Sequence, residues 1–450
     1  MATYLRRVRN FSFDIKLFLL YNLLANIGFG VIELVFNFYL LEIGYREDFI
    51  GEWRAIQTIS MAIAAFSIGF WINRFGPWRV IVGGFVVFSF ASVAIGLVEN
   101  RYALDMLAIA YGAGLSCLFN PLMPFVMEYG KPEERQYVAA ISFSLISLSL
   151  MIGSLVGGFS PTIFGRVFSS ISPGSLEAYR AAILTGAMIA SLGLIPLLKM
   201  NEPRKQWQTA DHREAARSET VETRSRVRRD VAVFVAVGGL MSIGVGMVLP
   251  FYNVFLKDLG ASDNAVGFIY ALGGLTAAVI GLGAPMMANR LGSLNAVLVL
   301  RVSIIPFFFV LLFAPTLGLA VLAYLVRQAS ISMAWPIDST FIGEALPARA
   351  RAGVFGLRSS AWNAGFAIAT YAGGRIIVNS GYDLTFVSLI FFTGASAALF
   401  YVYFTRHPAV VSGAIPSALS TRGRTAMAMT TSRFDENVAE SDGNVRAPSS

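Results

Sequence analysis

The chain has 450 residues, of which 56% are apolar and only 14% are charged, and its mean hydropathy is +0.63. Soluble domains are typically about 45–50% apolar and about 25% charged, so this balance excludes an ordinary soluble, disordered or collagen-like protein. A single cysteine and two histidines, both in polar stretches, exclude an intramolecular disulfide, a cysteine- or histidine-based metal site and a histidine proton relay. The composition therefore predicts an integral membrane protein without a cofactor.

Twelve apolar stretches follow one another along the chain, each close to the roughly 20 residues that a membrane helix needs. They lie near 17–41, 50–72, 78–98, 103–127, 136–159, 178–199, 231–256, 264–288, 294–313, 317–343, 351–378 and 384–404. Short polar connections with Gly or Pro separate most of them, and the sequence lacks the alternating strands of about ten residues that build membrane barrels. We therefore predict an all-α polytopic fold with twelve transmembrane helices.

The distribution of basic residues predicts the orientation in the membrane. With the N-terminus inside, the cytoplasmic segments hold 25 of the 35 Lys and Arg, the external loops hold seven, and three lie within helices. This excess is the positive-inside signature, and it accounts for the net charge of +8 without a nucleic-acid partner. We expect a monomeric, multi-pass protein of the plasma (inner) membrane, embedded in the lipid bilayer, with both termini cytoplasmic.

Composition also divides the chain into five parts. These are a basic cytoplasmic N-terminus (1–16), a first six-helix bundle (17–199), a polar cytoplasmic linker (200–230), a second six-helix bundle (231–404) and a disordered cytoplasmic tail (405–450). The tail is rich in Ser, Thr, Ala and Gly, a composition that cannot bury a core. The basic run at 224–229 is interpreted as a topology signal that also attracts anionic lipid headgroups, with a regulatory partner site as the alternative.

An offset of 216 residues aligns the two halves without a gap. Between residues 27 and 76, twelve of fifty positions are identical at this offset, and most of these are Gly, Asn or Arg. The matches include Asn37 with Asn253, Gly51 with Gly267, and Asn73-Arg74-Phe-Gly76 with Asn289-Arg290-Leu-Gly292. Six helices per half give both halves the same orientation, so they are parallel repeats. Transporters commonly place the substrate site between such repeats, near the bilayer midplane.

The segment Gly69-Phe-Trp-Ile-Asn73-Arg74-Phe-Gly76-Pro-Trp-Arg79 resembles the loop motif G-x-x-x-D-R-x-G-R-R of the major facilitator superfamily. Helix count, linker and repeat agree with that family over about residues 15–405. Asn73 replaces the usual Asp, and Pro77 and Trp78 replace the paired basic residues. The family's antiporter signature, which ends G-P-x-x-G-G, here lacks its proline in Gly153-Ser154-Leu-Val-Gly157-Gly158, so this motif does not support exchange with protons. The resemblance implies a secondary transporter that works by alternating access.

The repeated Asn-Arg-x-Gly turns are candidate gating elements at the cytoplasmic edge. We expect Gly69 to remove a side chain where the second helix passes close to a neighbour. We expect Arg74 to lie within reach of the carboxylate of Glu128, and the repeat predicts the same relation for Arg290 and Glu344. We expect each arginine to bind its carboxylate when the protein is open outward, and the alternative is a topology-setting arginine in a tight turn.

Polar residues inside the predicted spans mark a candidate cavity, because a charge at a helix centre costs about 2.5–3.5 kcal/mol even on the lenient insertion scale. The first helix carries four such residues on a stripe about 60° wide at 100° per residue, and the tenth carries a second stripe. The resemblance implies that helices 1, 4, 7 and 10 line the central cavity, where the two stripes would face each other. The candidates for binding substrate or coupling ion are Asn26, Glu33, Asn37, Tyr111, Asn253, Tyr324, Arg327, Gln328 and Asp338.

Glu33 and Arg327 lie at similar depths, roughly 15 Å from the external ends of their helices. We predict that they form a pair that handles substrate or protons, and a purely structural pair is the alternative. Arg301 is interpreted as a side chain that extends to the membrane surface, and Arg358 either does the same or binds a ligand. The sequence contains no nucleotide-binding loop or nucleophile–base pair.

These observations predict a secondary transporter of a small solute, anionic or compatible with aromatic residues, and Glu33 leaves room for proton coupling. The alternatives are a membrane-embedded enzyme and a non-transporting sensor or scaffold on the same fold.

Overall fold

The computed structural model describes residues 11–129, 135–200 and 221–411, and within these ranges the chain is helical, with no β-strand. Ten of its helices are long and apolar enough to cross a membrane. One of the ten, α3 (Glu47–Ile95), contains two of the predicted spans, so the ten helices account for eleven of them. The twelfth corresponds to α16 (Ala348–Ser380), which is too polar to count among the ten. The prediction of an all-α polytopic fold with a twelve-helix arrangement is confirmed.

Several predicted spans consist of two consecutive helices. The first half contains α2 (Phe13–Glu42), α3, α4 (Arg101–Phe119), α5 (Leu122–Tyr129), α6 (Arg135–Val167), α7 (Leu176–Leu192) and α8 (Leu194–Leu198). The second half contains α9 (Val221–Val248), η2 (Leu249–Phe251), α10 (Tyr252–Asp258), α11 (Asp263–Gly281), α12 (Ala284–Leu291), α13 (Ser293–Val302), α14 (Ile305–Leu311), α15 (Leu317–Ala345), α16, α17 (Asp383–Phe404) and α18 (Pro408–Val411). Pro121, Pro250 and Pro306 stand at three of the breaks, where a missing N–H interrupts the helical hydrogen bonds.

The repeat is visible in the backbone as matched glycine turns. Gly44 and Gly260 have φ angles of 96° and 89°, and Gly76 and Gly292 have φ angles of 81° and 78°. A side chain would be strained at such angles, so each pair preserves a tight turn at the same place in both halves. At Gly76 this turn separates the two spans of α3.

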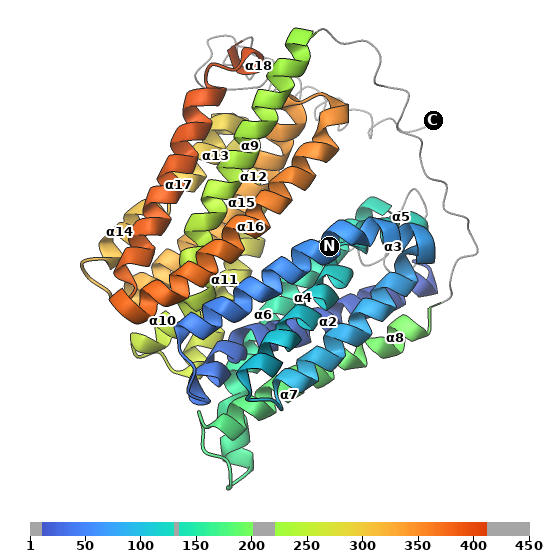
Figure 1. Ribbon diagram of the computed structural model, residues 1–450, viewed down its shortest axis with the longest axis vertical. Helices are drawn as coiled ribbons and strands as arrows, with labels where there is room; N and C mark the ends of the chain where they lie inside the picture. Colours follow the sequence, from blue (N-terminus) through green and yellow to red (C-terminus); the bar gives the residue numbers. More distant parts are fainter. Residues whose placement is uncertain (1–10, 130–134, 201–220, 412–450) are drawn as a thin grey trace, which may run out of the picture.

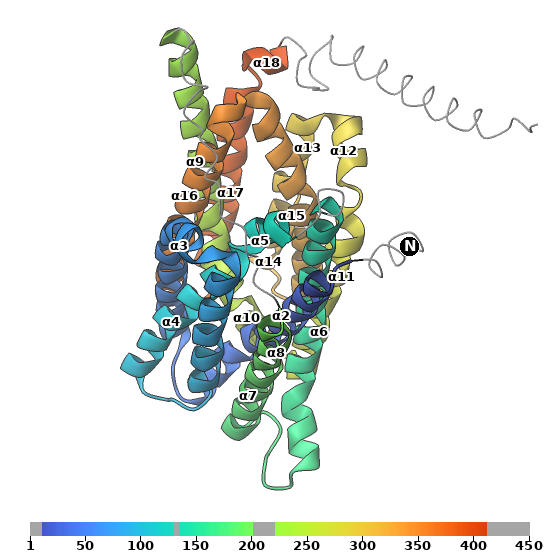
Figure 2. The same cartoon turned by 90° about the vertical axis from the view of Figure 1, so that its right-hand side faces the viewer.

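The two halves pack against each other at one end of the molecule and diverge toward the other (Figures 1 and 2). At the packed end, α3 contacts α16, and α6 contacts α11. We call this the latch end, because Asn37 and Asn253 join the halves there. We call the opposite end, where α8 stops and α9 starts, the linker end. The segments 1–10, 130–134, 201–220 and 412–450 lie outside the described residues.

Two predicted boundaries differ from the structure. Helix α9 begins at Val221 and not near 231, because its first turns contain Arg and Glu, which favour a helix even beyond the membrane. Residues 405–411, predicted to open a disordered tail, include α18 and the buried His407. His407 thus lies in a polar stretch of the sequence and is nevertheless buried, beside Asp230. His212 lies outside the described residues.

Candidate substrate site

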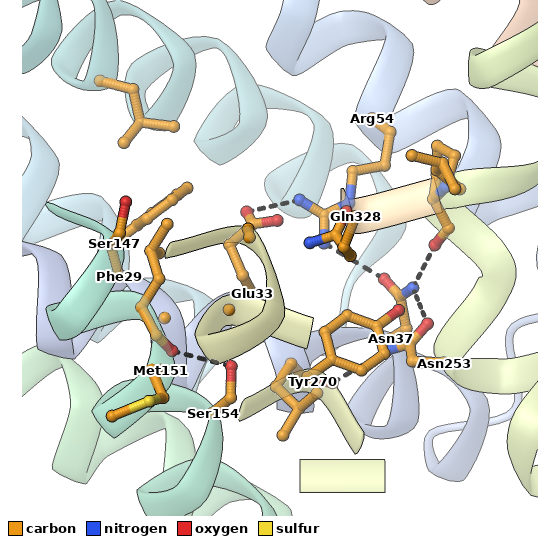
Figure 3. Close-up of a pocket in the computed structure, with 18 of the residues that line it drawn as sticks. Phe29, Glu33, Asn37, Arg54, Ser147, Met151, Ser154, Asn253, Tyr270 and Gln328 are labelled. Atoms are coloured by element: carbon orange, nitrogen blue, oxygen red, sulfur yellow. Dashed lines mark hydrogen bonds and ion pairs between the residues drawn. The ribbon is translucent and has the colours of Figure 1, made fainter. Parts of the chain in front are cut away.

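A cavity of about 590 Å³ lies between the two halves (Figure 3). Its wall comes from α2, α3, α4 and α6 of the first half and from η2, α10, α11, α15 and α16 of the second. Phe, Leu and Met side chains form most of the wall, and its polar residues include Glu33, Asn37, Arg54, Asn253 and Gln328. Sites for small molecules commonly have volumes of about 300–1,000 Å³ and this mainly apolar lining.

Glu33 on α2 forms an ion pair with Arg54 on α3, with 2.6 Å between Oε1 and Nη1 (Figure 3). Arg54 also donates to Oε1 of Gln57 at 3.2 Å and to Oδ1 of Asn37 at 3.4 Å. The Arg54 side chain is 10% exposed and that of Glu33 is 32% exposed, so the carboxylate is the more accessible partner. The predicted pair between Glu33 and Arg327 is not formed, because an arginine on the adjacent helix of the same half takes the carboxylate.

The sequence reasoning missed Arg54, although two signals could have found it. The residue is a charge within the apolar stretch 50–72, and its counterpart at the 216-residue offset is Tyr270. Tyr111 and Arg327 are counterparts in the same way. Each half therefore carries one arginine and one tyrosine at these two repeat positions: the arginine comes first in the first half, and the tyrosine comes first in the second half. Tyr270 and Arg54 both line the cavity.

Arg327 is 9% exposed, and its Nη1 donates to Oε1 of Gln328 at 2.8 Å. Gln328 and Tyr324 line the cavity, whereas Arg327 does not. The hydrogen bond to Gln328 connects the Arg327 guanidinium to the cavity wall. The Tyr324 ring stacks on those of Tyr252 and Tyr270, with centroid distances of 5.7 Å and 4.8 Å. Within the described part of the chain, no carboxylate forms an ion pair with Arg327. An unpaired buried charge is costly, and Arg327 lacks the counter-ion that Arg54 has in Glu33.

Four of the nine predicted cavity residues, Asn26, Tyr111, Arg327 and Asp338, do not line the cavity. Asn26 and Tyr111 are buried within the first half. Asn26 is buried in α2, where its Nδ2 donates to Oδ1 of Asn22 at 2.6 Å. Tyr111 is fully buried, with its ring centroid 5.6 Å from that of Trp53 and 5.1 Å from that of Phe88. Both side chains belong to the packing of the first half.

Asp338 belongs to a separate ionic cluster in the second half. Its carboxylate accepts a hydrogen bond from Arg301 on α13 at 3.2 Å and another from Arg358 on α16. Arg301 is only 4% exposed, and its guanidinium lies 4.8 Å from the centroid of the Phe400 ring. The expectation that Arg301 extends to the surface is wrong, because a buried carboxylate binds it inside the bundle.

Asn37 and Asn253 connect the halves at the cavity wall, as Figure 3 shows. Asn37 Nδ2 lies 2.9 Å from Asn253 Oδ1 and 2.6 Å from the carbonyl oxygen of Pro250. Asn253 Nδ2 donates in turn to the carbonyl oxygen of Leu34 at 2.9 Å. A further hydrogen bond between the halves runs from the hydroxyl of Tyr179 on α7 to Oδ2 of Asp263 on α11, at 2.8 Å. These bonds hold the latch end closed.

The predicted gating turns lie at the linker end. Arg74 is exposed, with its guanidinium 5.6 Å from the centroid of the Phe75 ring. The side chain of Glu128 lies outside the described residues, so its clamp with Arg74 stays a prediction. In the second half, Arg290 and Glu344 are both exposed and form no ion pair with each other.

The close approach predicted at Gly69 is absent in this conformation, because a Cβ atom added there would meet nothing within 4 Å. Gly69 lies toward the end of the molecule at which the two halves diverge (Figures 1 and 2).

Two parallel six-helix halves around a cavity are the architecture of a membrane transporter. The family profile of the Major Facilitator Superfamily matches residues 18–337. The chain belongs to this superfamily.

Known relatives are distant. The quinolone resistance protein NorA of Staphylococcus aureus is 26% identical over 137 residues, which cover 30% of this chain and 35% of NorA. The multidrug resistance protein MdtG of Proteus mirabilis is 21% identical over 277 residues, which cover 60% of this chain and 64% of MdtG. The chain thus aligns with less than two thirds of either relative. A crystal structure of a variant of the nucleoside transporter NupG has a TM-score of 0.69 at 14% identity and covers 88% of this chain and 99% of its own, a similarity of fold.

Proposed function

We propose that the protein is a secondary transporter that moves a small solute through the central cavity by alternating access of its two halves. The observation that carries this proposal is the position of the cavity between the repeats, with hydrogen bonds across the latch end and separated halves at the linker end. This conformation presents the cavity to one side of the membrane only.

We further propose that the linker end faces the cytoplasm, in a monomer of the plasma (inner) membrane with both termini inside. The support is the excess of Lys and Arg in the segments at that end. Reporter fusions after residues 210 and 410 should both give cytoplasmic signals. An external signal at either position would contradict this orientation.

The preferred substrate is an organic anion with an aromatic or apolar body. Arg327 supplies a cation without a carboxylate partner in the described part of the chain, next to the cavity residues Tyr324 and Gln328. Charge-assisted hydrogen bonds to a guanidinium are about twice as strong as neutral ones, so an acidic group would be held there. Phe29 and Tyr270 offer aromatic surface to the rest of the solute.

The Glu33–Arg54 pair gives a physical route to proton coupling. A proton on Glu33 would remove the negative charge and leave the Arg54 guanidinium without its counter-ion. An anion that enters the cavity would then compensate that positive charge. Protonation and anion binding therefore favour each other, which is the linkage that a symporter requires.

Export of varied apolar compounds is a second candidate function. Met61 and Met151 line the cavity, and flexible thioether side chains adapt to ligands of different shape. The relatives NorA and MdtG are named for quinolone and multidrug resistance. On this alternative, Arg327 would contribute little to binding.

A thermal-shift screen of purified wild-type protein against organic anions and neutral or cationic apolar compounds separates these functions. We expect organic anions to stabilise the wild type and to lose most of that effect in Arg327→Gln. Arg375→Gln is the control for the loss of one positive charge, because Arg375 is exposed, whereas Arg327 is buried and bonded to the cavity residue Gln328. Equal stabilisation of all three proteins by neutral compounds, with no response to anions, would favour the second function. Uptake into proteoliposomes then tests transport itself.

A further inference from the structure

A second pocket, of about 420 Å³, lies at the linker end between the start of α9 and the end of α17. It shares no lining residue with the central cavity. The basic run that precedes the apolar part of α9 contributes two of its arginines, Arg226 and Arg229. A third arginine, Arg406, follows the last turn of α17.

Buried polar contacts give this pocket a defined wall. Asp230 is 2% exposed and accepts a hydrogen bond from the Tyr403 hydroxyl at 2.6 Å. Nε2 of His407 lies 3.4 Å from the same carboxylate, and Nδ1 of this imidazole accepts the backbone N–H of Ala409 at 3.3 Å. A neutral imidazole that accepts at Nδ1 carries its proton at Nε2, so it donates to Asp230. These bonds join α9, the end of α17 and α18.

The charge of the pocket is unbalanced. Arg226 and Arg229 are three residues apart on α9, which places them about one turn apart on one side of the helix. Both are exposed, as is Arg406, and none of the three forms an ion pair with a carboxylate among the described residues. The carboxylate in the wall, Asp230, is already bound by Tyr403 and His407. The three guanidinium groups are therefore available to an anion.

An apolar surface continues from this basic pocket along a membrane-spanning helix. Val402 lines the pocket on α17 and is 56% exposed, and the adjacent Tyr401 is 47% exposed. Exposed apolar side chains on such a helix face lipid, whereas the arginines stand at its end. A molecule with a phosphate group and an acyl chain matches both parts of this surface.

We propose that the pocket binds the phosphate headgroup of an anionic phospholipid from the leaflet at the linker end. Arg226, Arg229 and Arg406 hold the phosphate, and the acyl chain lies along α17 past Val402. With the linker end in the cytoplasm, this is the leaflet that carries anionic lipids, and basic pockets between helices on that side are suited to their headgroups. The bound lipid would fix the end of the second half at the membrane surface whichever solute the protein transports.

Lipid retention by the full-length protein tests this proposal. Wild type and variants are reconstituted in phosphatidylcholine nanodiscs that contain phosphatidylglycerol, and the phosphatidylglycerol that stays bound is counted by native mass spectrometry. The double variant Arg229→Gln/Arg406→Gln should bind phosphatidylglycerol about 30-fold more weakly, at about fivefold for each arginine near the surface. Arg228→Gln is the matched control, since Arg228 lies in the same basic run, is exposed and does not line the pocket. It should retain lipid as the wild type does.

If Arg228→Gln lost as much bound phosphatidylglycerol as the double variant, the attraction would be a diffuse property of the surface and the proposed site would be wrong. Unchanged phosphatidylglycerol retention in the double variant would also contradict the site. Glycerol phosphate in excess distinguishes a lipid from a soluble phosphate: lipid retention should persist, and displacement would overturn the assignment to a lipid. Thermal unfolding in pure phosphatidylcholine provides the folding control, because the substituted side chains are exposed. If the double variant unfolds, the single variant Arg226→Gln replaces it, and its binding of phosphatidylglycerol should be about fivefold weaker than that of the wild type.

Discussion

Asn37 and Asn253 are counterparts in the repeat, and each donates to the main chain of the other half. Asn37 donates to the carbonyl oxygen of Pro250, and Asn253 donates to that of Leu34. Pro250 and Leu34 are themselves 216 residues apart, so the two bonds are related by the symmetry of the repeat. The asparagine of each half thus donates to the equivalent carbonyl oxygen of the other half, so the same contact is made twice.

Substitution of either asparagine should open the latch end. Asn37→Ala leaves a buried carbonyl without a donor, at a cost of about 1–3 kcal/mol, which corresponds to roughly a 5- to 150-fold shift toward the state with the latch end apart. Asn253→Ala should do the same, and the double variant should show less than the sum, because the two side chains share one contact.

Cysteine labelling from both sides of the membrane measures this shift, with Ser154→Cys in the cavity on a Cys117→Ser background. Asn26→Ala is the control, since Asn26 is also buried on α2 but bonds within its own helix. Unchanged labelling in both Asn37→Ala and Asn253→Ala would reject the latch.

Two glycines on α3 should have opposite effects on the conformational equilibrium. A Cβ atom at Gly51 would lie 2.5 Å from the carbonyl oxygen of Thr370 in the other half, whereas one at Gly69 would meet no atom within 4 Å. Gly51→Leu should therefore disfavour the present conformation by an overpacking cost of about 1–3 kcal/mol. Gly69→Leu should leave this conformation intact and oppose closure of the linker end, which slows turnover. Distances between spin labels on the two halves report both shifts, and a shift of the same sign in both variants would refute this prediction.

Glu33 and Arg54 should behave as one unit in stability and transport. Arg54→Gln removes the partner of a partly buried carboxylate, and Glu33→Gln strands a buried guanidinium, so each variant should unfold at a lower temperature. The double variant Glu33→Gln/Arg54→Gln should recover part of that loss, because no charge is left unpaired. Glu33→Gln/Arg327→Gln is the control and should show additive losses, since the structure separates these two residues into different contacts.

Transport by Glu33→Gln tests the coupling. We expect this variant to keep exchange of substrate across the membrane but to lose accumulation driven by a pH gradient. Normal pH-driven accumulation in Glu33→Gln would exclude Glu33 as the coupling residue and leave the ion pair with a structural role.

The ionic cluster around Asp338 should act on stability more than on substrate binding. Asp338→Asn leaves Arg301 and Arg358 facing each other without a carboxylate, and the loss of a buried partner costs about 3–5 kcal/mol. The thermal unfolding midpoint should fall, and the affinity of the remaining folded protein for solute should change little. Asp383→Asn, in the first turn of α17, is the control. A large loss of affinity at unchanged stability would return Asp338 to the binding site.

The repeat and the helix count could be predicted from the sequence because both depend on local pattern. Gly44 and Gly260, or Gly76 and Gly292, have the same backbone angles because the same residue occupies the same turn. The partners of charged residues could not be predicted in this way. A helical wheel gives the direction of Glu33 relative to its own helix, whereas its pairing with Arg54 depends on how α2 and α3 are rotated against each other. The buried position of Arg301 could not be predicted for a similar reason, since its carboxylate partner, Asp338, comes from another helix.

The exchange of arginine and tyrosine between the halves gives the cavity a direction. Strict twofold symmetry would offer a solute two equivalent poses, related by half a turn about the axis between the halves. Glu33 neutralises Arg54 in the first half, whereas Arg327 in the second half keeps its charge. On the proposed function, an anionic solute would therefore be oriented with its acidic end toward α15. The Arg/Tyr exchange would thus leave such a solute one favoured orientation out of the two that a symmetric repeat allows.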